Sequence, residues 1–196
     1  MDLIQDLRNE TADAHRTLER ELVKKIKSIR TSEDYVDLLH LMHGFYAAME
    51  SHLHRYLSGE QGLDFQKRRK AERIIEDIKT EGGAETGKSC HKLPAINSLS
   101  SALGAMYVLE GSTLGGQIIT AMLKRQMERE SDTGLSFFLG YGEETPRMWE
   151  RFKSYLNREF SVQQQGEILR AANETFNSFH NWVQQYELEK TGAIKV

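Results

Sequence analysis

Apolar side chains recur every three or four residues along most of this chain, which is the periodicity of helices packed through one face. The first such stripe includes Leu3, Leu7, Leu18, Leu22 and Ile26. The pattern predicts helices over residues 3–29, 31–56, 64–79, 96–127, 144–160 and 161–188. No segment has the alternation that would predict a strand. We therefore expect an all-α fold with one domain over residues 1–196, of which residues 189–196 form a frayed tail.

Local signals mark where helices begin and where the chain leaves them. Hydroxyl and acidic residues at positions 31–34 are typical of a helix start, and Pro146 suits the first turn of a later helix. Residues 80–93 are rich in glycine, serine and charge and predict a loop. Residues 137–142 predict an apolar connection packed on the core. The basic run at residues 67–70 is interpreted as a solvated face, with a patch for an acidic partner as the alternative.

One stretch interrupts the longest apolar segment: residues 110–117 read Glu-Gly-Ser-Thr-Leu-Gly-Gly-Gln. A glycine inside a helix costs roughly 1 kcal/mol relative to alanine, so Gly111, Gly115 and Gly116 make this a weak and bendable piece of helix. Missing Cβ atoms also let a backbone approach its neighbour closely. Two interpretations follow, close packing of helices through small residues or a flat cofactor lying against a kinked helix. The spacing alone favours neither.

Composition limits the class of protein. Of 196 residues, 39% are hydrophobic and 28% charged, the balance of a soluble globular domain with its own core. A net charge of −3 gives no reason to expect nucleic acid as a partner. No apolar run is long enough to span a bilayer and the N-terminus does not read as a signal peptide, so no membrane is expected. The single cysteine, Cys90, excludes an internal disulfide, and a cytoplasmic location is expected.

Histidines are the next candidates for chemistry. His15 lies on the apolar stripe of the first predicted helix with Glu19 one turn later, so the two side chains can touch. Such a histidine is either a packed core residue or a ligand. Four more lie on the second predicted helix: His40, His43, His52 and His54. Di-iron bundles use Glu-x-x-His pairs, and because no histidine here has a glutamate three positions before it, we do not expect such a site.

Most templates for catalysis are absent from the chain. It has no Gly-x-Ser-x-Gly elbow, Cys90 has no reason to be reactive, and the glycines follow a helical pattern rather than the strand of a phosphate-binding loop. What remains is a histidine on the first helix, a glycine-rich kink on a central helix and an aromatic last helix. These are parts that can hold a haem, which needs an axial imidazole and an apolar slot.

Two motifs carry a resemblance to the haem oxygenases. Residues 7–19 resemble the Leu-x-x-x-Thr-x-x-x-His-x-x-x-Glu opening of that family. The matching positions are Leu7, Thr11, His15 and Glu19. Residues 107–117 are similar to the distal-helix motif of the family, and most similar to its bacterial, bacteriophytochrome-associated branch. The order and separation of the elements agree over about residues 3–188, which implies the haem-oxygenase fold with a glycine-kinked distal helix.

The resemblance also implies where a haem is held. It makes His15 the proximal iron ligand and Glu19 the acceptor that fixes the orientation and tautomer of the imidazole. Gly111 and Gly115 are implied to bring the distal backbone against the porphyrin, so that dioxygen is directed toward a meso carbon. The haem is then both substrate and cofactor.

Contacts at the edge of the haem follow from the same resemblance. Arg8 falls where the family places a basic contact to a propionate. Lys153 is implied as a second such contact, with Arg147 and Arg151 as alternatives. Two aromatic residues either line the macrocycle or are ordinary core residues: Phe176 and Phe179.

One position departs from the family pattern. Many haem oxygenases have an aspartate directly after the first distal glycine, where it organises proton-donating waters, and here that residue is Ser112. A hydroxyl carries no charge and orders water less firmly. Glu110 points elsewhere on an ideal helix, so protons either pass by Ser112, Thr113 and backbone-held waters or activity is impaired. Tyr107 lies one residue from the position of a propionate-contacting tyrosine of the family, and no role is assigned to it.

The function that the resemblance implies is cleavage of haem to biliverdin, carbon monoxide and ferrous iron, with O2 and with electrons from a separate reductase or ferredoxin. Two alternatives stay open: a non-catalytic haem carrier or sensor on the same fold, and a haem-free helical interaction protein whose glycines permit close packing. The sequence leaves open which meso carbon is cleaved, the identity of the electron donor, whether a bacteriophytochrome receives the biliverdin, the oligomeric state and the physiological role.

Overall fold

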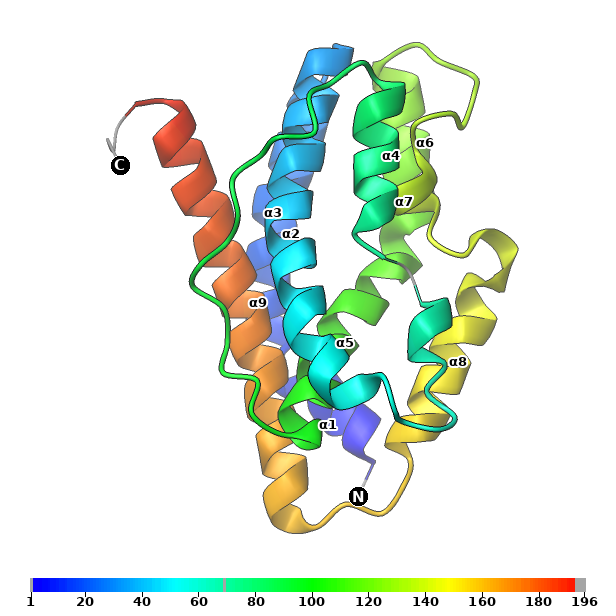
Figure 1. Cartoon of the computed structure of the whole chain (residues 1–196), viewed down its shortest axis with the longest axis vertical. Helices are drawn as coiled ribbons and strands as arrows, with labels where there is room; N and C mark the ends of the chain where they lie inside the picture. The colour runs from blue at the N-terminus through cyan, green and yellow to red at the C-terminus, as the bar shows by residue number, and fades with distance from the viewer. Residues whose placement is uncertain (1, 69, 193–196) are drawn as a thin grey trace.

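Three helices form the centre of the computed structural model: α3 (Ser32–Leu57), α5 (Leu99–Gly111) and α9 (Val162–Lys190) (Figure 1). The structure describes residues 2–68 and 70–192. Every regular element within those ranges is helical, so the predicted all-α class is confirmed. Within them, no helix is both long and apolar enough to span a bilayer.

The remaining elements surround this centre. The other α-helices are α1 (Leu3–Glu10), α2 (Ala12–Ser28), α4 (Glu72–Thr80), α6 (Gly116–Gln126), α7 (Ser136–Leu139) and α8 (Thr145–Leu156). The short 3-10 turns are η1 (Phe65–Lys67), η2 (Ser112–Gly115) and η3 (Gly142–Glu144). In Figure 1, α4 packs beside the upper half of α3, α6 lies beyond α4, and α8 lies lower on the same side of the view, while α9 lies on the opposite side. The long connection between α4 and α5 runs across the front of α3 and α9.

The core is built where α3 and α5 pack on α9. A Cβ added at Gly104 of α5 would lie 2.2 Å from the carbonyl oxygen of Ile168 on α9, so the absence of a side chain lets these helices approach closely. The rings of Phe45 and Phe179 stack with centroids 4.2 Å apart. Buried Trp182 donates its indole N–H to the carbonyl of Leu41 at 2.8 Å, so the polar atom of this large side chain is satisfied.

Several helix starts are where the sequence signals placed them. Thr31 and Asp34 form a reciprocal capping box at the start of α3, which satisfies two backbone N–H groups that have no partner within the helix. Ser161 and Gln164 do the same for α9. Pro146 lies in the first turn of α8, where its missing N–H costs nothing.

The prediction of one continuous helix over residues 3–29 is wrong. The chain forms two helices that meet at Thr11, whose hydroxyl donates to the carbonyl of Leu7 at 2.7 Å. A threonine that bonds back to a carbonyl one turn earlier loosens and bends a helix. Because the two helices are separate, the direction of α2, which carries His15, is not fixed by that of α1.

Other boundaries also differ from prediction. The helix predicted over 64–79 is instead the 3-10 turn η1 followed by α4 from Glu72, because Asp64 has a left-handed φ of 52° and Arg68 an extended backbone, and neither residue can continue a helix. The helix predicted over 144–160 ends at Leu156. In the predicted tail, 189–196, α9 continues to Lys190, and residues 193–196 lie outside the described residues.

Candidate functional site

The glycine-rich stretch divides one long apolar segment into two helices. The segment predicted as a single helix over 96–127 is α5, then the 3-10 turn η2, then α6. The predicted kink is therefore present, and it lies at residues 112–115. The side chains around this kink divide between two faces of the segment. One face is packed against the protein and the other is open.

The packed face of the kink carries Glu110, Thr113 and Gly116, all buried. A Cβ added at Gly116 would lie only 1.9 Å from the carbonyl oxygen of Phe138. Gly116 therefore allows the connection after α6 to pass directly over the backbone of the distal helix. The apolar connection predicted at residues 137–142 does pack on the core: Phe137 and Phe138 are buried.

The open face carries Gly111, Leu114, Gly115 and Ile118. A Cβ at Gly115 would meet nothing within 4 Å, and one at Gly111 would meet only the Trp149 ring at 3.9 Å. Leu114 and Ile118 are 48% and 68% exposed. Large aliphatic side chains left in solvent beside bare backbone mark a surface that a flat apolar ligand can cover.

His15 lies on α2, which meets α6 at the end remote from the kink. There Gln126 donates its side-chain N–H to the carbonyl of Ile26 at 2.7 Å. His15 precedes Ile26 and Gly115 precedes Gln126 by the same number of residues, eleven, or about 16 Å of helix. His15 and Gly115 thus lie equally far along the chain from the point where the two helices meet.

The imidazole of His15 is exposed and rests against a buried aromatic ring of α9. Its centroid lies 5.2 Å from that of Phe176, with the rings tilted by 43°. Phe179, one turn further along α9, is instead buried against Phe45 and Tyr46. Glu19 is exposed on α2, and within the described ranges no hydrogen bond joins it to His15. The structure thus brings His15 and Phe176 together but forms no hydrogen bond between His15 and Glu19 among the described residues.

The four basic candidates differ in the partners they already have. Lys153 pairs with Glu150 at 2.7 Å, Arg147 with Glu144 at 3.1 Å, and Arg151 with Asp64 at 2.8 Å. Arg8 is exposed on α1 and forms no ion pair within the part of the chain that the structure describes. Arg8 is therefore the candidate that is ready to bind a carboxylate.

Tyr107 on α5 lies close to Arg8 and Thr11, so the kinked segment contacts the junction of α1 and α2. Burial raises the pKa of the Tyr107 phenol, while the charge of Arg8 and a hydrogen bond with Thr11 act in the opposite direction. The phenol therefore stays protonated at neutral pH. Its ring also packs against Trp149 of α8, with centroids 5.7 Å apart.

Ser112 has a partner that the sequence did not identify. The hydroxyl of Tyr46 on α3 lies 2.8 Å from Ser112 Oγ, and Ser112 in turn donates to the carbonyl of Leu109 at 2.6 Å. Because Ser112 gives its one hydroxyl proton to Leu109, Tyr46 is the donor in its bond with Ser112. Tyr46 is buried and Ser112 exposed, so a buried phenol backs the hydroxyl at the kink. In the sequence Tyr46 is one of many apolar-stripe residues of its helix, and nothing singled it out.

The interpretation of residues 67–70 as a solvated face is wrong for Arg68. Its guanidinium is buried and bonds to Glu110 Oε2 at 2.6 Å, because a carboxylate inside an apolar helix needs a partner. Arg69 lies outside the described residues. The sequence does hold a signal for this pair. Glu110 is a charged residue within an apolar segment and needs a basic partner, and the basic run at residues 67–70 could supply one.

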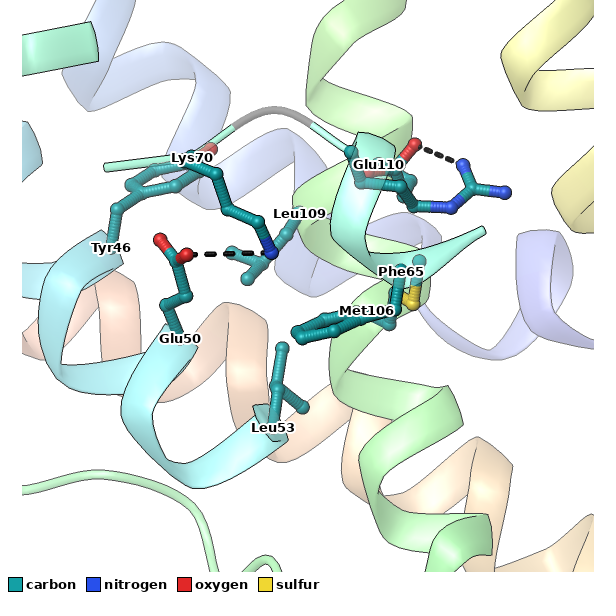
Figure 2. Close-up of a pocket in the computed structure, with 9 residues that line it drawn as sticks. Tyr46, Glu50, Leu53, Phe65, Lys70, Met106, Leu109 and Glu110 are labelled. Atoms are coloured by element: carbon teal, nitrogen blue, oxygen red, sulfur yellow. Dashed lines mark hydrogen bonds and ion pairs between the residues drawn. The ribbon is translucent and has the colours of Figure 1, made fainter. Parts of the chain in front are cut away.

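A small cavity lies behind the kink, between α3, α5 and the segment before α4 (Figure 2). Its volume is about 30 Å³, enough for one or two waters. The Glu50 carboxylate and the Lys70 ammonium face each other across it, 3.4 Å apart, and Tyr46 forms part of its wall. The cavity therefore places room for water beside the phenol that donates to Ser112.

A haem fits these residues on three counts. The bare backbone at Gly111 and Gly115 leaves space for a flat ring, the exposed Leu114 and Ile118 offer it apolar contact, and the exposed imidazole of His15 is available as a ligand.

Comparison with known proteins agrees in fold and family. A curated protein, "Heme oxygenase" of Xanthomonas campestris pv. campestris (strain 8004), is 29% identical over 153 residues, which are 76% of this chain and 88% of that protein. The NO- and CO-bound heme oxygenase of Neisseria meningitidis superposes with a TM-score of 0.80 at 18% identity, covering 95% of this chain and 92% of that one. Heme oxygenase-1 of Synechocystis sp. PCC 6803 in complex with heme gives 0.72 at 16%, covering 98% and 96%. Since the family model described as "Heme oxygenase" matches residues 1–185, the chain belongs to the haem oxygenase family.

Proposed function

We propose that this protein binds haem between α2 and the kinked segment and cleaves it to biliverdin, carbon monoxide and ferrous iron. The observation that carries the proposal is the open face at Gly111, Leu114, Gly115 and Ile118, with the exposed His15 imidazole on α2, the helix that packs beside α6. When bound, haem supplies both the iron that activates dioxygen and the ring that is oxidised. Electrons come from a separate reductase or ferredoxin, and biliverdin is available to a bacteriophytochrome.

The residues have distinct roles in this proposal. His15 is the iron ligand, and its ring rests on Phe176 of α9. Glu19 is close enough along α2 to accept from the imidazole N–H once a ligand fixes the ring. Arg8 pairs with one propionate, and Lys153 can exchange its exposed partner Glu150 for the other. Leu114 and Ile118 exclude water from the face of the ring.

Proton supply is assigned to Ser112 and Tyr46. Because Ser112 is neutral, it cannot hold waters as a carboxylate does, but Tyr46 donates to it from the buried side. The cavity behind the kink, which Tyr46, Glu50 and Lys70 all line, has room for the water that would connect this phenol with the two charged groups. In this proposal the chain offers protons a route from the α3 side of the kink toward its open face.

Turnover of added hemin is the direct test. Purified protein mixed with one equivalent of hemin is expected to show a Soret band, and ascorbate or a reductase under air is expected to replace that band with the absorbance of biliverdin. Carbon monoxide release gives a second readout. A Soret band that persists through aerobic reduction would identify a haem carrier instead, and the lack of any Soret band would leave only the haem-free interaction protein.

Replacing Ser112 tests the proton route. Ser112→Ala is expected to slow biliverdin formation about tenfold. This is less than the usual effect of losing a general acid, because a water can occupy the space left by the hydroxyl and carry the proton instead. Haem affinity should stay within about twofold, because Ser112 contributes no apolar contact. Ser51→Ala is the matched control, since Ser51 donates in the same way to a carbonyl of its own helix. An unchanged rate and an unchanged solvent isotope effect in Ser112→Ala would exclude this hydroxyl from the route.

A further inference from the structure

A buried carboxylate lies immediately before the kink, on the face opposite the proposed haem slot. Glu110 Oε2 accepts from Arg68 Nη1 at 2.6 Å. The Tyr141 hydroxyl donates to the same carboxylate, 2.9 Å from Oε1 and 3.2 Å from Oε2. The side chains of Glu110 and Arg68 are 6% and 2% exposed. Since a buried ion pair is often no more stabilising than apolar residues of the same volume, stability alone explains this arrangement poorly.

Arg68 ties two other segments, the one before α4 and helix α8, to the kink. Besides Glu110, its guanidinium donates to the carbonyl of Leu63 at 2.9 Å and to that of Met148 at 3.2 Å. It also lies over the Phe152 ring of α8, 5.4 Å from the centroid. Met148 adjoins Trp149, the residue nearest to a Cβ built on Gly111. The ion pair therefore fixes Gly111 relative to α8 and to the segment before α4.

The segment 136–141, which we call the brace, holds the rest of the packed face. Phe138 lies over Gly116 and Gly140 lies beside Thr113. The brace is anchored from α4: Asp77 accepts from the backbone N–H groups of Ser136 at 3.0 Å and Phe137 at 2.8 Å. Burial raises the pKa of the Asp77 carboxyl, and those two N–H groups act against that rise. Tyr141 then joins the far end of the brace to Glu110.

We propose that Glu110 is a positioning residue, which through Arg68 and Tyr141 fixes the backbone of Gly111 and Gly115 at the distance from the haem plane that the reaction needs. A helix with three glycines in six residues is intrinsically weak, so its own hydrogen bonds do not favour one bend over another. The bonds of the Glu110 carboxylate to Arg68 and Tyr141, on the packed face, favour a single bend. The opposite face, toward the proposed haem slot, stays without side chains at Gly111 and Gly115. This inference rests on the proposed haem slot.

The test uses Glu110→Gln with Glu81→Gln as its matched control. Glu81 is a similarly buried carboxylate, 5% exposed and paired with Arg129 beyond the far end of α6. In the haem-free protein, amide hydrogen exchange of residues 111–116 is expected to speed up at least tenfold in Glu110→Gln and to stay unchanged in Glu81→Gln. Haem should dissociate about tenfold faster from Glu110→Gln, and its turnover should give a mixture of biliverdin isomers.

Tyr141→Phe keeps the test decisive if loss of the charge prevents folding. It removes one hydrogen bond and retains the ion pair, so a smaller change in the same direction is expected, about threefold in exchange at residues 111–116. Two results together would overturn the positioning role. The first is that Tyr141→Phe has the same amide exchange and the same isomer composition as wild type. The second is that Glu110→Gln is either unfolded or no different from the Glu81→Gln control. Failure of the wild-type protein to bind haem would instead overturn the proposed function, so the two failures are distinguishable.

Discussion

His15→Ala is expected to abolish the spectrum of a histidine-ligated haem and to lower biliverdin formation at least 100-fold. The imidazole is exposed on α2, which packs beside α6, and it is the proposed iron ligand. Without that ligand the porphyrin keeps only its apolar and propionate contacts. The expected spectrum is therefore that of a weakly held haem without an axial imidazole.

Two measurements separate ligation from folding. His15 is exposed, and its ring contact is with Phe176, so His15→Ala should change the free energy of unfolding of the haem-free protein by no more than about 0.5 kcal/mol. Added imidazole should restore the lost absorption, because it can occupy the space of the missing ring. His52→Ala, an exposed histidine bonded to a carbonyl of its own helix, is the control and should retain full activity. A His15→Ala protein with the wild-type spectrum would exclude this assignment.

Much of the fold was predictable because its signals are local. Capping residues at Thr31 and Ser161, the proline of α8 and the apolar stripes each depend on neighbours a few residues away, so the sequence alone shows them. The break at Thr11 was not predictable in the same way, since a threonine within a helix bonds back to a carbonyl only in some contexts.

The site was predictable in its motifs and less so in its contacts. The kink at residues 112–115 follows from glycine content, whereas the spacing that placed His15 on an apolar stripe did not show that its imidazole is exposed. Arg68 was misread because a basic run is usually solvated, and only the folded chain brings it to Glu110, far away in sequence. Tyr46 was missed for the same reason, since its bond to Ser112 joins two helices. Contacts between distant segments need tertiary structure, whichever local pattern carries the residues.

Adjacent glycines of the kink are expected to respond oppositely to the same change. Gly115→Ala should leave the haem-free protein as stable as wild type, or up to about 1 kcal/mol more stable, because its φ of −83° is helical and its Cβ would meet nothing. Its haem affinity should nevertheless fall about tenfold or more, because the methyl group takes space that the ring needs. Hemin titration and thermal unfolding of the haem-free protein measure the two effects.

Gly116→Ala should do the reverse. Its Cβ would lie 1.9 Å from the Phe138 carbonyl oxygen, so the brace must move, at a cost of about 3 kcal/mol, or roughly 6–12 °C in Tm for a chain of this size. Haem affinity of the folded fraction should fall less than in Gly115→Ala. The two interpretations of the glycine stretch, close packing and a cofactor surface, then apply to different residues. Equal destabilisation by both substitutions, or unchanged haem affinity in Gly115→Ala, would mean that packing accounts for both glycines and that the haem lies elsewhere.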